Sequence, residues 1–325
     1  MAYKTAAIVI NWNSWSELDI CLKAVKHQTV PFDRIVVVDN ASNKSGQNII
    51  SEWNSQVEFH ILAKNEGFAK ANNIAFETIK DYDYFALVNP DAYLEKDWLQ
   101  NMLLAAEHYQ NVASFASCLV MANDRGRLDG CGDNYHMSGF VWREWHGRVL
   151  DNLLKKEKSV FSACAAAAFY RFDTFEAVGG FDEDYFCYLE DVDLGFRLKL
   201  LGYNCVLVPN AIAYHVGSAT TGGKHSDFAV YHGHRNLVWT YVKNMPGFLF
   251  WVLLPFHLIL NLVSIILFVA RGQGFVILKA KWDALKGVKA MWHKRKKIQA
   301  SRVVSEKDIW RELDKRILLR VSDRT

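Results

Sequence analysis

Apolar runs and helical patterns alternate along the first ninety residues of the chain. Four mostly apolar runs are typical of buried strands, at residues 6–10, 34–39, 57–62 and 84–88. Two stretches of helical spacing lie between them, one through Leu18, Cys21, Leu22 and Val25 and one over 67–79. Strands that alternate with helices predict parallel β-α-β units, so we expect an α/β fold with a mostly parallel sheet and helices on both faces.

Polar side chains stand where three of these runs end. Asn11, Asp39 and Asp91 each follow a predicted strand. Ligands of parallel sheets bind beyond the carboxyl ends of the strands. A turn or cap remains the alternative at each position, since the Asn-Pro-Asp order before Ala92 and the Asp-Asn pair at 39–40 are common in turns. Three such groups at three strand ends nevertheless favour a binding site.

The glycine turn at 65–73, NEGFAKANN, enters a predicted helix. Backbone N–H groups at a helix start suit a phosphate. The stretch is neither a P-loop nor a GxGxxG motif, so it predicts a phosphate contact only weakly.

The second half is less regular. Residues 120–160 lack clear periodicity and predict a long irregular excursion, in which Trp142, Arg143 and Trp145 are candidates either for ligand contact or for membrane contact. Residues 190–201 predict a helix that is closed by Gly202, and 205–208 a short strand that ends at Pro209.

Composition narrows the class of protein. The 325 residues carry a net charge of +3, which does not suggest nucleic-acid binding. The cysteines show no paired spacing, so we expect a reduced, cytosolic setting, and the N-terminus lacks the long apolar run of a secretory signal.

The C-terminal part departs from this balance. Residues 247–270 contain no charged side chain, and nine Lys or Arg stand against one acid, Asp283, over 271–297. The apolar stretch is long enough to cross a bilayer, but Pro255 and Asn261 interrupt it, and its basic flank favours the cytoplasmic side. We expect a re-entrant hairpin or an in-plane helix pair, with 275–298 as an interfacial helix on anionic lipid. A buried core helix of a soluble domain is the alternative.

Six motifs follow one another along the chain: IVINWNS at 8–14, VVVDNAS at 36–42, NEGFAKANN at 65–73, LVNPDAYL at 87–94, GGFDEDYFCYLEDVDLGFRLKLLGY at 179–203 and AYHVGSAT at 213–220. Together they resemble glycosyltransferase family 2, most closely its bacterial rhamnosyltransferase-like members that build cell-surface polysaccharides. The resemblance implies the A-type glycosyltransferase fold over 1–244, followed by a membrane-associated helical region over 245–325.

The resemblance also implies residue roles in binding a nucleotide sugar, dTDP- or UDP-linked. Expected around the nucleotide and its diphosphate are Asn11, Asn13, Asp39, Gly67, Phe68, Asn72 and Asn89. Arg235 is a candidate for a diphosphate contact, with an ordinary surface arginine as the equal alternative.

Asp91 stands where the family keeps the last acid of its DxD metal motif, and Asn89 replaces the first acid. His215 matches a histidine that completes the site for Mg²⁺ or Mn²⁺ in similar enzymes. Asp191 matches the catalytic base, and Glu190 would orient the acceptor or the loop.

One base, one metal and no second carboxylate nucleophile imply an inverting transfer to a lipid-linked or polysaccharide acceptor. Two other classes are weighed against it. A nucleotidyltransferase would need a Gly- and Lys-rich phosphate loop near the N-terminus, which the sequence lacks. A non-catalytic glycan-binding or sugar-nucleotide-binding partner is disfavoured because Asp91, Asp191 and His215 are all present. The sequence does not predict the oligomeric state.

Overall fold

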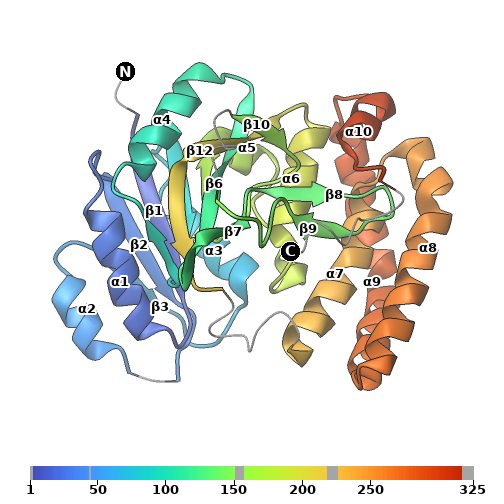
Figure 1. Ribbon diagram of the computed structural model, residues 1–325, viewed down its shortest axis with the longest axis horizontal. Helices are drawn as coiled ribbons and strands as arrows, with labels where there is room; N and C mark the ends of the chain where they lie inside the picture. Colours follow the sequence, from blue (N-terminus) through green and yellow to red (C-terminus); the bar gives the residue numbers. More distant parts are fainter. Residues whose placement is uncertain (1–2, 44, 151–156, 218–225, 317–325) are drawn as a thin grey trace.

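The computed structural model describes residues 3–43, 45–150, 157–217 and 226–316. Its centre is a ten-stranded sheet with the order β10-β12-β6-β11-β4-β1-β2-β3, to which β5 adds beside β12 and β7 beside β6 (Figure 1). The strands are β1 (Thr5–Asn11), β2 (Arg34–Asp39), β3 (Glu58–Ile61), β4 (Tyr84–Val88), β5 (Ala92–Leu94), β6 (Val112–Met121), β7 (Asp124–Gly130), β10 (Lys158–Val160), β11 (Ala167–Arg171) and β12 (Asn204–His215).

The expected mostly parallel sheet is confirmed for its first half. β1 pairs in parallel with both β2 and β4, and β2 with β3. β11 then enters antiparallel between β4 and β6, while β6 and β12 run parallel to each other. The carboxyl ends of β1, β2, β4 and β12 therefore meet at one edge of the sheet.

Two apolar layers cover the faces of the sheet. One contains α1 (Trp15–Lys26) and α4 (Trp98–His108). The other contains α3 (Phe68–Phe76), α5 (Phe172–Ala177) and part of α6 (Glu190–Leu200). The short helix α2 (Gln47–Trp53) joins β2 to β3. The helices on both faces follow from the apolar character of both sides of these strands.

The expectation of an irregular excursion over 120–160 was wrong in part, because short strands run through about half of its described residues. β8 (Asp133–Tyr135) and β9 (Val141–Arg143) form a separate two-stranded sheet. The predicted strand at 205–208 was too short. β12 continues through Pro209 to His215, with a shift in register between Val208 and Ile212, and such a bulge lets a strand carry a proline.

Over residues 226–316 the C-terminal region forms four helices: α7 (Asp227–Asn244), α8 (Gly247–Ala270), α9 (Gly274–Ser301) and α10 (Glu306–Glu312). They share a third apolar core with α6 and β8, which includes Phe196, Tyr241, Phe250, Met291 and Ile309. Residues on both sides of the expected boundary at 244 and 245 pack in this core. The division into two domains there stays a prediction.

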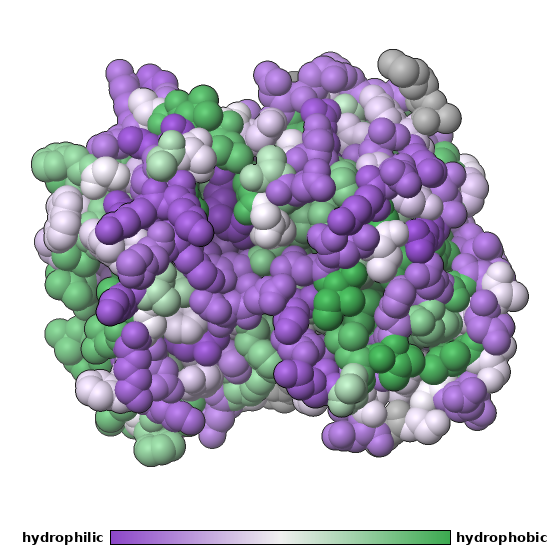
Figure 2. Space-filling view, turned by 180° about the vertical axis from the view of Figure 1, so that it is seen from behind, coloured by the Kyte–Doolittle hydropathy of each residue, from purple (hydrophilic) through white to green (hydrophobic). Residues whose placement is uncertain are grey.

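Helix α8 has the predicted bounds, and it alone among the described residues is long and apolar enough to cross a membrane. Only 17% of its most apolar window is buried, which disfavours a core helix. Figure 2, seen from behind, shows hydrophobic residues along the edge that α8 forms. The first half of α9 continues this face with Phe275, Leu278, Trp282 and Leu285, all exposed.

Candidate active site

The ends of β1 and β2 hold one carboxylate in a fixed position. Asn11 and Asp39 are partners in the register, and Asn11 Nδ2 donates to Asp39 Oδ1 over 2.9 Å. Ser42 Oγ donates to the same oxygen (2.5 Å), and the Ser42 backbone N–H donates to Asp39 Oδ2 (3.2 Å). Asn11 is fully buried and Asp39 is 4% exposed. The buried Asn11 side chain therefore fixes the orientation of the Asp39 carboxylate.

Ser42, to which the sequence motif assigned no role, also ties down the next loop. The Asn13 backbone N–H donates to Ser42 Oγ (2.7 Å), and the Asn43 N–H donates to Asn13 Oδ1 (2.8 Å). Asn13 adopts a φ of 57°, which asparagine tolerates better than most residues. These bonds join the loops after β1 and β2.

Asn40 links the same edge to the glycine turn. Its side chain donates to Asn65 Oδ1 and to the Gly67 carbonyl, and it accepts from the Glu66 N–H (2.8 Å). Gly67 has a φ of 83°, and a Cβ there would lie 2.7 Å from the Phe186 carbonyl oxygen. Only glycine fits this approach.

The start of α3 is engaged within the protein. The Ala69 N–H donates to the Phe186 carbonyl (3.2 Å), and Asn72 Nδ2 donates to the Phe68 carbonyl (2.8 Å). The phosphate contacts expected for Gly67, Phe68 and Asn72 stay predictions. The structure does bring this turn against the segment that precedes Glu190 and Asp191.

A carboxylate and an imidazole face each other beside the end of β4. His215 ends β12 and pairs with Ala92 of β5, and its Nε2 lies 3.6 Å from Asp91 Oδ1. The Val216 N–H also donates to the Asp91 carbonyl (3.0 Å). Residues 124 positions apart are thus joined, as the resemblance implied.

Asp129 of β7 contacts the pair formed by Asp91 and His215, and the sequence analysis missed it. Its Oδ2 lies 2.7 Å from His215 Nδ1 and forms an ion pair with Arg143. Burial opposes protonation of His215, but the bonds with Asp129 and Asp91 outweigh it and raise the pKa of the imidazole. An acid 86 positions away leaves no local sequence signal.

The donor set suits a divalent cation that a ligand helps to hold. A histidine whose other nitrogen bonds a carboxylate is a common metal ligand, and Asp129 leaves Nε2 directed at Asp91. Among the described residues no three His, Cys, Asp or Glu could hold an ion by themselves. The remaining positions would fall to phosphate oxygens and water.

Asn89 contributes through its backbone. Its N–H donates to the Ala166 carbonyl (2.8 Å), and its carbonyl accepts from the Ala92 N–H (2.9 Å). These bonds form the turn that carries Pro90 and Asp91. Ala165, the residue before Ala166, donates its N–H to Asp191 Oδ2 (3.1 Å). Asp91 and Asp191 are therefore positioned by the same short segment.

Glu190 and Asp191 begin α6 after a strained approach. Phe186, Tyr188 and Leu189 have φ of 63°, 69° and 64°, in the left-handed region that such side chains seldom occupy. The Asp191 carboxylate accepts from Ala165 and Val192, whereas Glu190 Oε2 is buried with no hydrogen-bond partner among the described residues.

Burial is the main cause of the pKa shifts of the acids around the start of α6. It raises the pKa of Glu190 well above its ordinary value, and the Asp191 charge adds to this. It also raises the pKa of Asp191, against the two backbone N–H donors. Asp133, buried nearby, has its pKa raised to about 7 by burial and by Asp191. Perturbed acids of this kind are typical of functional sites.

Arg235 lies on α7 and bonds to the strained segment. Its Nη2 donates to the carbonyls of Asp184 (3.0 Å) and Tyr185 (2.8 Å), and its Nε donates to Asn236 Oδ1. Asn236, fully buried, donates to the carbonyls of Tyr185, Cys187 and Tyr188. Arg235 and Asn236 therefore fix the backbone of the segment that precedes Glu190. The diphosphate contact of Arg235 stays a prediction.

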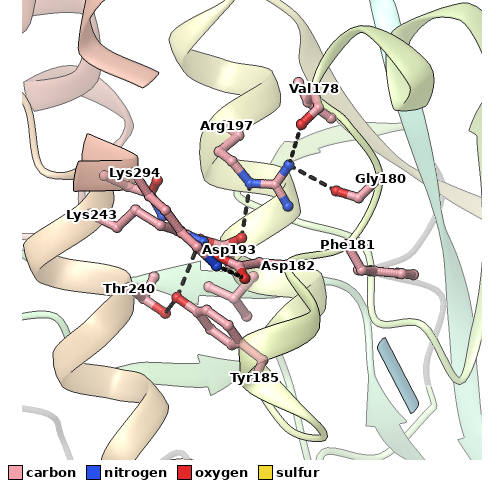
Figure 3. Close-up of polar contacts among 12 residues, drawn as sticks. Val178, Gly180, Phe181, Asp182, Tyr185, Asp193, Arg197, Thr240, Lys243 and Lys294 are labelled. Atoms are coloured by element: carbon pink, nitrogen blue, oxygen red, sulfur yellow. Dashed lines mark hydrogen bonds and ion pairs between the residues drawn. The ribbon is translucent and has the colours of Figure 1, made fainter. Parts of the chain in front are cut away.

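An ionic network lies behind this segment (Figure 3). Lys243 of α7, 1% exposed, bridges Asp193 (2.7 Å) and Asp182 (2.5 Å). Lys294 of α9 joins Asp182 and Asp184, and Arg197 Nε donates to Asp193 Oδ2 (2.9 Å). The network fixes α6, and with it Asp191, to α7 and α9.

Comparison with known proteins agrees with this arrangement. Residues 6–179 match the family model described as glycosyl transferase family 2. The chain is 31% identical over 161 residues to rhamnosyltransferase WbbL of Escherichia coli, which covers 46% of this chain and 60% of WbbL. It is 39% identical over 83 residues to N-acetylglucosaminyl-diphospho-decaprenol L-rhamnosyltransferase of Mycobacterium tuberculosis, covering 25% of this chain and 27% of that protein. The matches thus span less than two thirds of these relatives.

Solved structures share the fold at low identity. The mannosyltransferase PcManGT of Pyrobaculum calidifontis, solved with GDP-Man and Mn²⁺, has a TM-score of 0.56 at 15% identity and covers 96% of this chain and 88% of its own. The S. aureus TarS fragment 1–349 has a TM-score of 0.54 at 16% identity and covers 92% and 90%. The expected A-type glycosyltransferase fold is confirmed. With the family match over more than half of its length, the chain belongs to glycosyltransferase family 2, and its similarity is to rhamnosyltransferases of that family.

Proposed function

We propose that this protein is an inverting glycosyltransferase of bacterial cell-surface glycan synthesis. It moves a sugar from a dTDP- or UDP-linked donor to a hydroxyl of a lipid-linked or polysaccharide acceptor. Rhamnose is the first candidate for this sugar. The family match and the names of the relatives support the reaction class and the sugar. The observation that carries the proposal is the meeting of Asp91, His215 and Asp191 around the end of β4.

The donor occupies the carboxyl edge of the sheet in this proposal. Asp39, held by Asn11 and Ser42, meets the base or ribose. Asn13, Gly67, Phe68, Asn72, Asn89 and Arg235 line the nucleotide and diphosphate. Asp91 and His215 hold a divalent cation, Mg²⁺ or Mn²⁺, which when bound offsets charge on the departing diphosphate.

Asp191 acts as the general base that takes the proton of the acceptor hydroxyl as its oxygen attacks the anomeric carbon. Its raised pKa strengthens it as a base. Burial raises the pKa of Glu190 and so favours its protonated form, which suits a hydrogen-bond donor to the acceptor or the loop better than a nucleophile. The acceptor oxygen displaces the nucleoside diphosphate in a single step, without a covalent enzyme intermediate, and this inverts the anomeric centre.

In this proposal the protein lies on the cytoplasmic side of the cell membrane, and the apolar outer face of α8 and of the start of α9 supports its attachment there. α8 packs through Phe250, Leu253 and His257, and His257 bonds the Ser138 carbonyl (2.8 Å). A helix fixed sideways to the catalytic part in this way supports in-plane, monotopic attachment to anionic lipid over a single crossing. A nearby membrane surface suits a lipid-linked acceptor.

Transfer assays with dTDP- and UDP-linked sugars, rhamnose included, test the proposal on lipid-linked acceptors with Mn²⁺ or Mg²⁺. We expect product of inverted configuration, and slow donor hydrolysis without acceptor. Asp91→Ala should remove the metal-dependent part of donor binding in calorimetry. Tight donor binding without transfer or hydrolysis would instead indicate a non-catalytic binding partner.

A further inference from the structure

The two-stranded sheet of β8 and β9 lies between the main sheet and the C-terminal helices (Figure 1). Successive side chains of a strand point to opposite faces. Trp142 packs on one face, where its ring centroid lies 5.8 Å from that of Phe140 and 5.4 Å from the Arg316 guanidinium. Arg143, the next residue, therefore points to the other face, and its partner in the register is Asp133.

Arg143 is joined through Asp129 to the pair formed by Asp91 and His215. Its Nη1 donates to Asp129 Oδ2, the same oxygen that lies 2.7 Å from His215 Nδ1. Gly130 leaves room for this approach, since a Cβ there would lie 2.9 Å from the Cβ of Arg143. The guanidinium is therefore separated by one carboxylate from the histidine that faces Asp91.

The other neighbours of Arg143 lead to the proposed base. Asp133, its register partner, accepts from Ser162 Oγ (3.1 Å), and in the same segment the Ala165 N–H donates to Asp191. Burial raises the pKa of Asp191, and the positive charge of Arg143 acts against that rise without a hydrogen bond between the two side chains. Arg143 thus lies between the proposed cation site and the proposed base.

Part of the guanidinium is accessible to a ligand. The Arg143 side chain is 26% exposed, whereas that of its ion-pair partner Asp129 is 8% exposed. The Nε and Nη2 atoms of Arg143 form no hydrogen bond among the described residues, and neither is enclosed by protein. Accessible N–H groups that the fold does not use can donate to an oxygen of the substrate.

The charge around Arg143 favours a neutral oxygen over a phosphate. Asp129 pairs with it, and Asp133 and Asp191 bring two further acids close to it. A phosphate in this position would therefore meet more negative than positive charge. A sugar hydroxyl is neutral, and its oxygen accepts from a guanidinium N–H. In a donor whose diphosphate lies at the cation and whose anomeric carbon is attacked beside the base, the transferred sugar occupies the space between them.

We propose that Arg143 is a specificity-determining residue that donates hydrogen bonds to hydroxyl oxygens of the sugar being transferred. The proposal rests on the function proposed above, and it adds a residue that contacts the sugar and not the nucleotide. Since a guanidinium stays protonated, Arg143 holds the sugar without exchanging a proton with it.

Calorimetry of the full chain with dTDP-rhamnose and with dTDP, each with Mn²⁺, separates the sugar from the nucleotide. UDP-linked sugars and UDP replace them if the transfer assays select that donor. Arg143→Lys keeps a cation for Asp129 but loses the planar fork of N–H donors. We expect binding of the sugar nucleotide to weaken roughly 10- to 100-fold, as for the loss of hydrogen bonds from a charged donor, while binding of the nucleoside diphosphate stays unchanged. Unchanged nucleoside diphosphate binding also shows that the variant is folded.

The matched control is Arg127→Lys, the same change at an exposed position of β7, and it should bind both ligands as the parent does. Equal weakening of both ligands in Arg143→Lys would overturn the proposal, because the effect would then pass through Asp129 to the cation. Unchanged affinity for both would overturn it as well, and a raised KM for the acceptor would then assign Arg143 to the acceptor. A parent that binds no sugar nucleotide and transfers no sugar would refute the proposed function itself, which distinguishes the two failures.

Discussion

Two groups of acids flank the first turn of α6, and their charges are held in opposite ways. Neither Glu190 nor Asp191 has a cationic hydrogen-bond partner among the described residues, and burial raises their pKa values. Asp193, two positions later, is fully buried against Lys243 and Arg197. Burial would raise its pKa too, but the two cations lower it. Asp191 and Asp193 are two positions apart, which turns a helix by about 200°, so these two acids lie on opposite sides of α6.

The comparison teaches how to distinguish a functional from a structural acid in this chain. A buried acid that has no cation beside it keeps a raised pKa, and a catalytic base or acid can use that shift. An acid paired with a buried lysine instead makes the fold depend on the pair. The predictions below test this division.

The largest effect is expected from Asp191→Asn, which keeps the shape and removes the proton acceptor. If Asp191 is the base, turnover should fall by roughly 10²–10⁴ while donor affinity changes little. Steady-state kinetics and donor calorimetry measure the two quantities. Stability should fall by only about 1 kcal/mol, because asparagine keeps one of the two oxygens that accept from the backbone N–H groups of Ala165 and Val192.

Glu190→Gln is the control for this pair, and a smaller loss of turnover is expected from it. If it proves the more damaging change, the two roles should be exchanged. Weakened donor binding with normal turnover in Asp191→Asn would place Asp191 in binding.

On the structural side, Lys243→Met leaves Asp182 and Asp193 short of a buried cation. Breaking a buried pair in this way costs about 3–5 kcal/mol of unfolding free energy. Denaturant unfolding measures it. Lys286→Met, on the exposed side of α9, serves as the control and should be close to neutral. A neutral Lys243→Met would mean that the network contributes little, and the division drawn here would fail.

Asp133 allows the comparison to be tested by the pH dependence of the unfolding free energy. Its pKa is raised from 3.8 to about 7, so the folded state binds more protons than the unfolded state between these values. Stability contributed by the protonated acid should therefore fall as pH rises from about 4 to 7, by at most about 1.4 kcal/mol per pH unit. Asp133→Asn should flatten this part of the profile of unfolding free energy against pH, and an unchanged profile would contradict the assignment.

The smallest effect is expected from Asp129→Asn, which weakens the group that orients His215. Second-shell changes of this kind typically lower metal affinity by about 10–100-fold. Titration of Mn²⁺ in the presence of nucleoside diphosphate measures it. Asp124→Asn, an exposed acid on the same strand, is the matched control. Parent-like affinity in Asp129→Asn would separate His215 from the metal.

The polar residues at the strand ends were predictable, because each of them is marked by its immediate sequence neighbours. Asn11, Asp39 and Asp91 follow apolar runs, and a strand end is visible in the sequence wherever such a run stops. Asp129 was not predictable, since its partner His215 is distant in sequence and its own strand, β7, is polar at four of seven positions. Arg235 was ambiguous for the same reason, because its partners are backbone carbonyls fifty positions away.

The sequence by itself determined the alternating elements, the polar strand ends, the bounds of α8 and the family. Each of these depends on periodicity or on motifs within a few residues. Only the tertiary structure decided the antiparallel entry of β11, the core shared by α6 and the C-terminal helices, and which acid of the Glu-Asp-Val-Asp run is paired. The physical reason is that burial and the approach of a cation arise from packing between distant segments, and these set the proton affinity of a carboxylate whose sequence context looks the same.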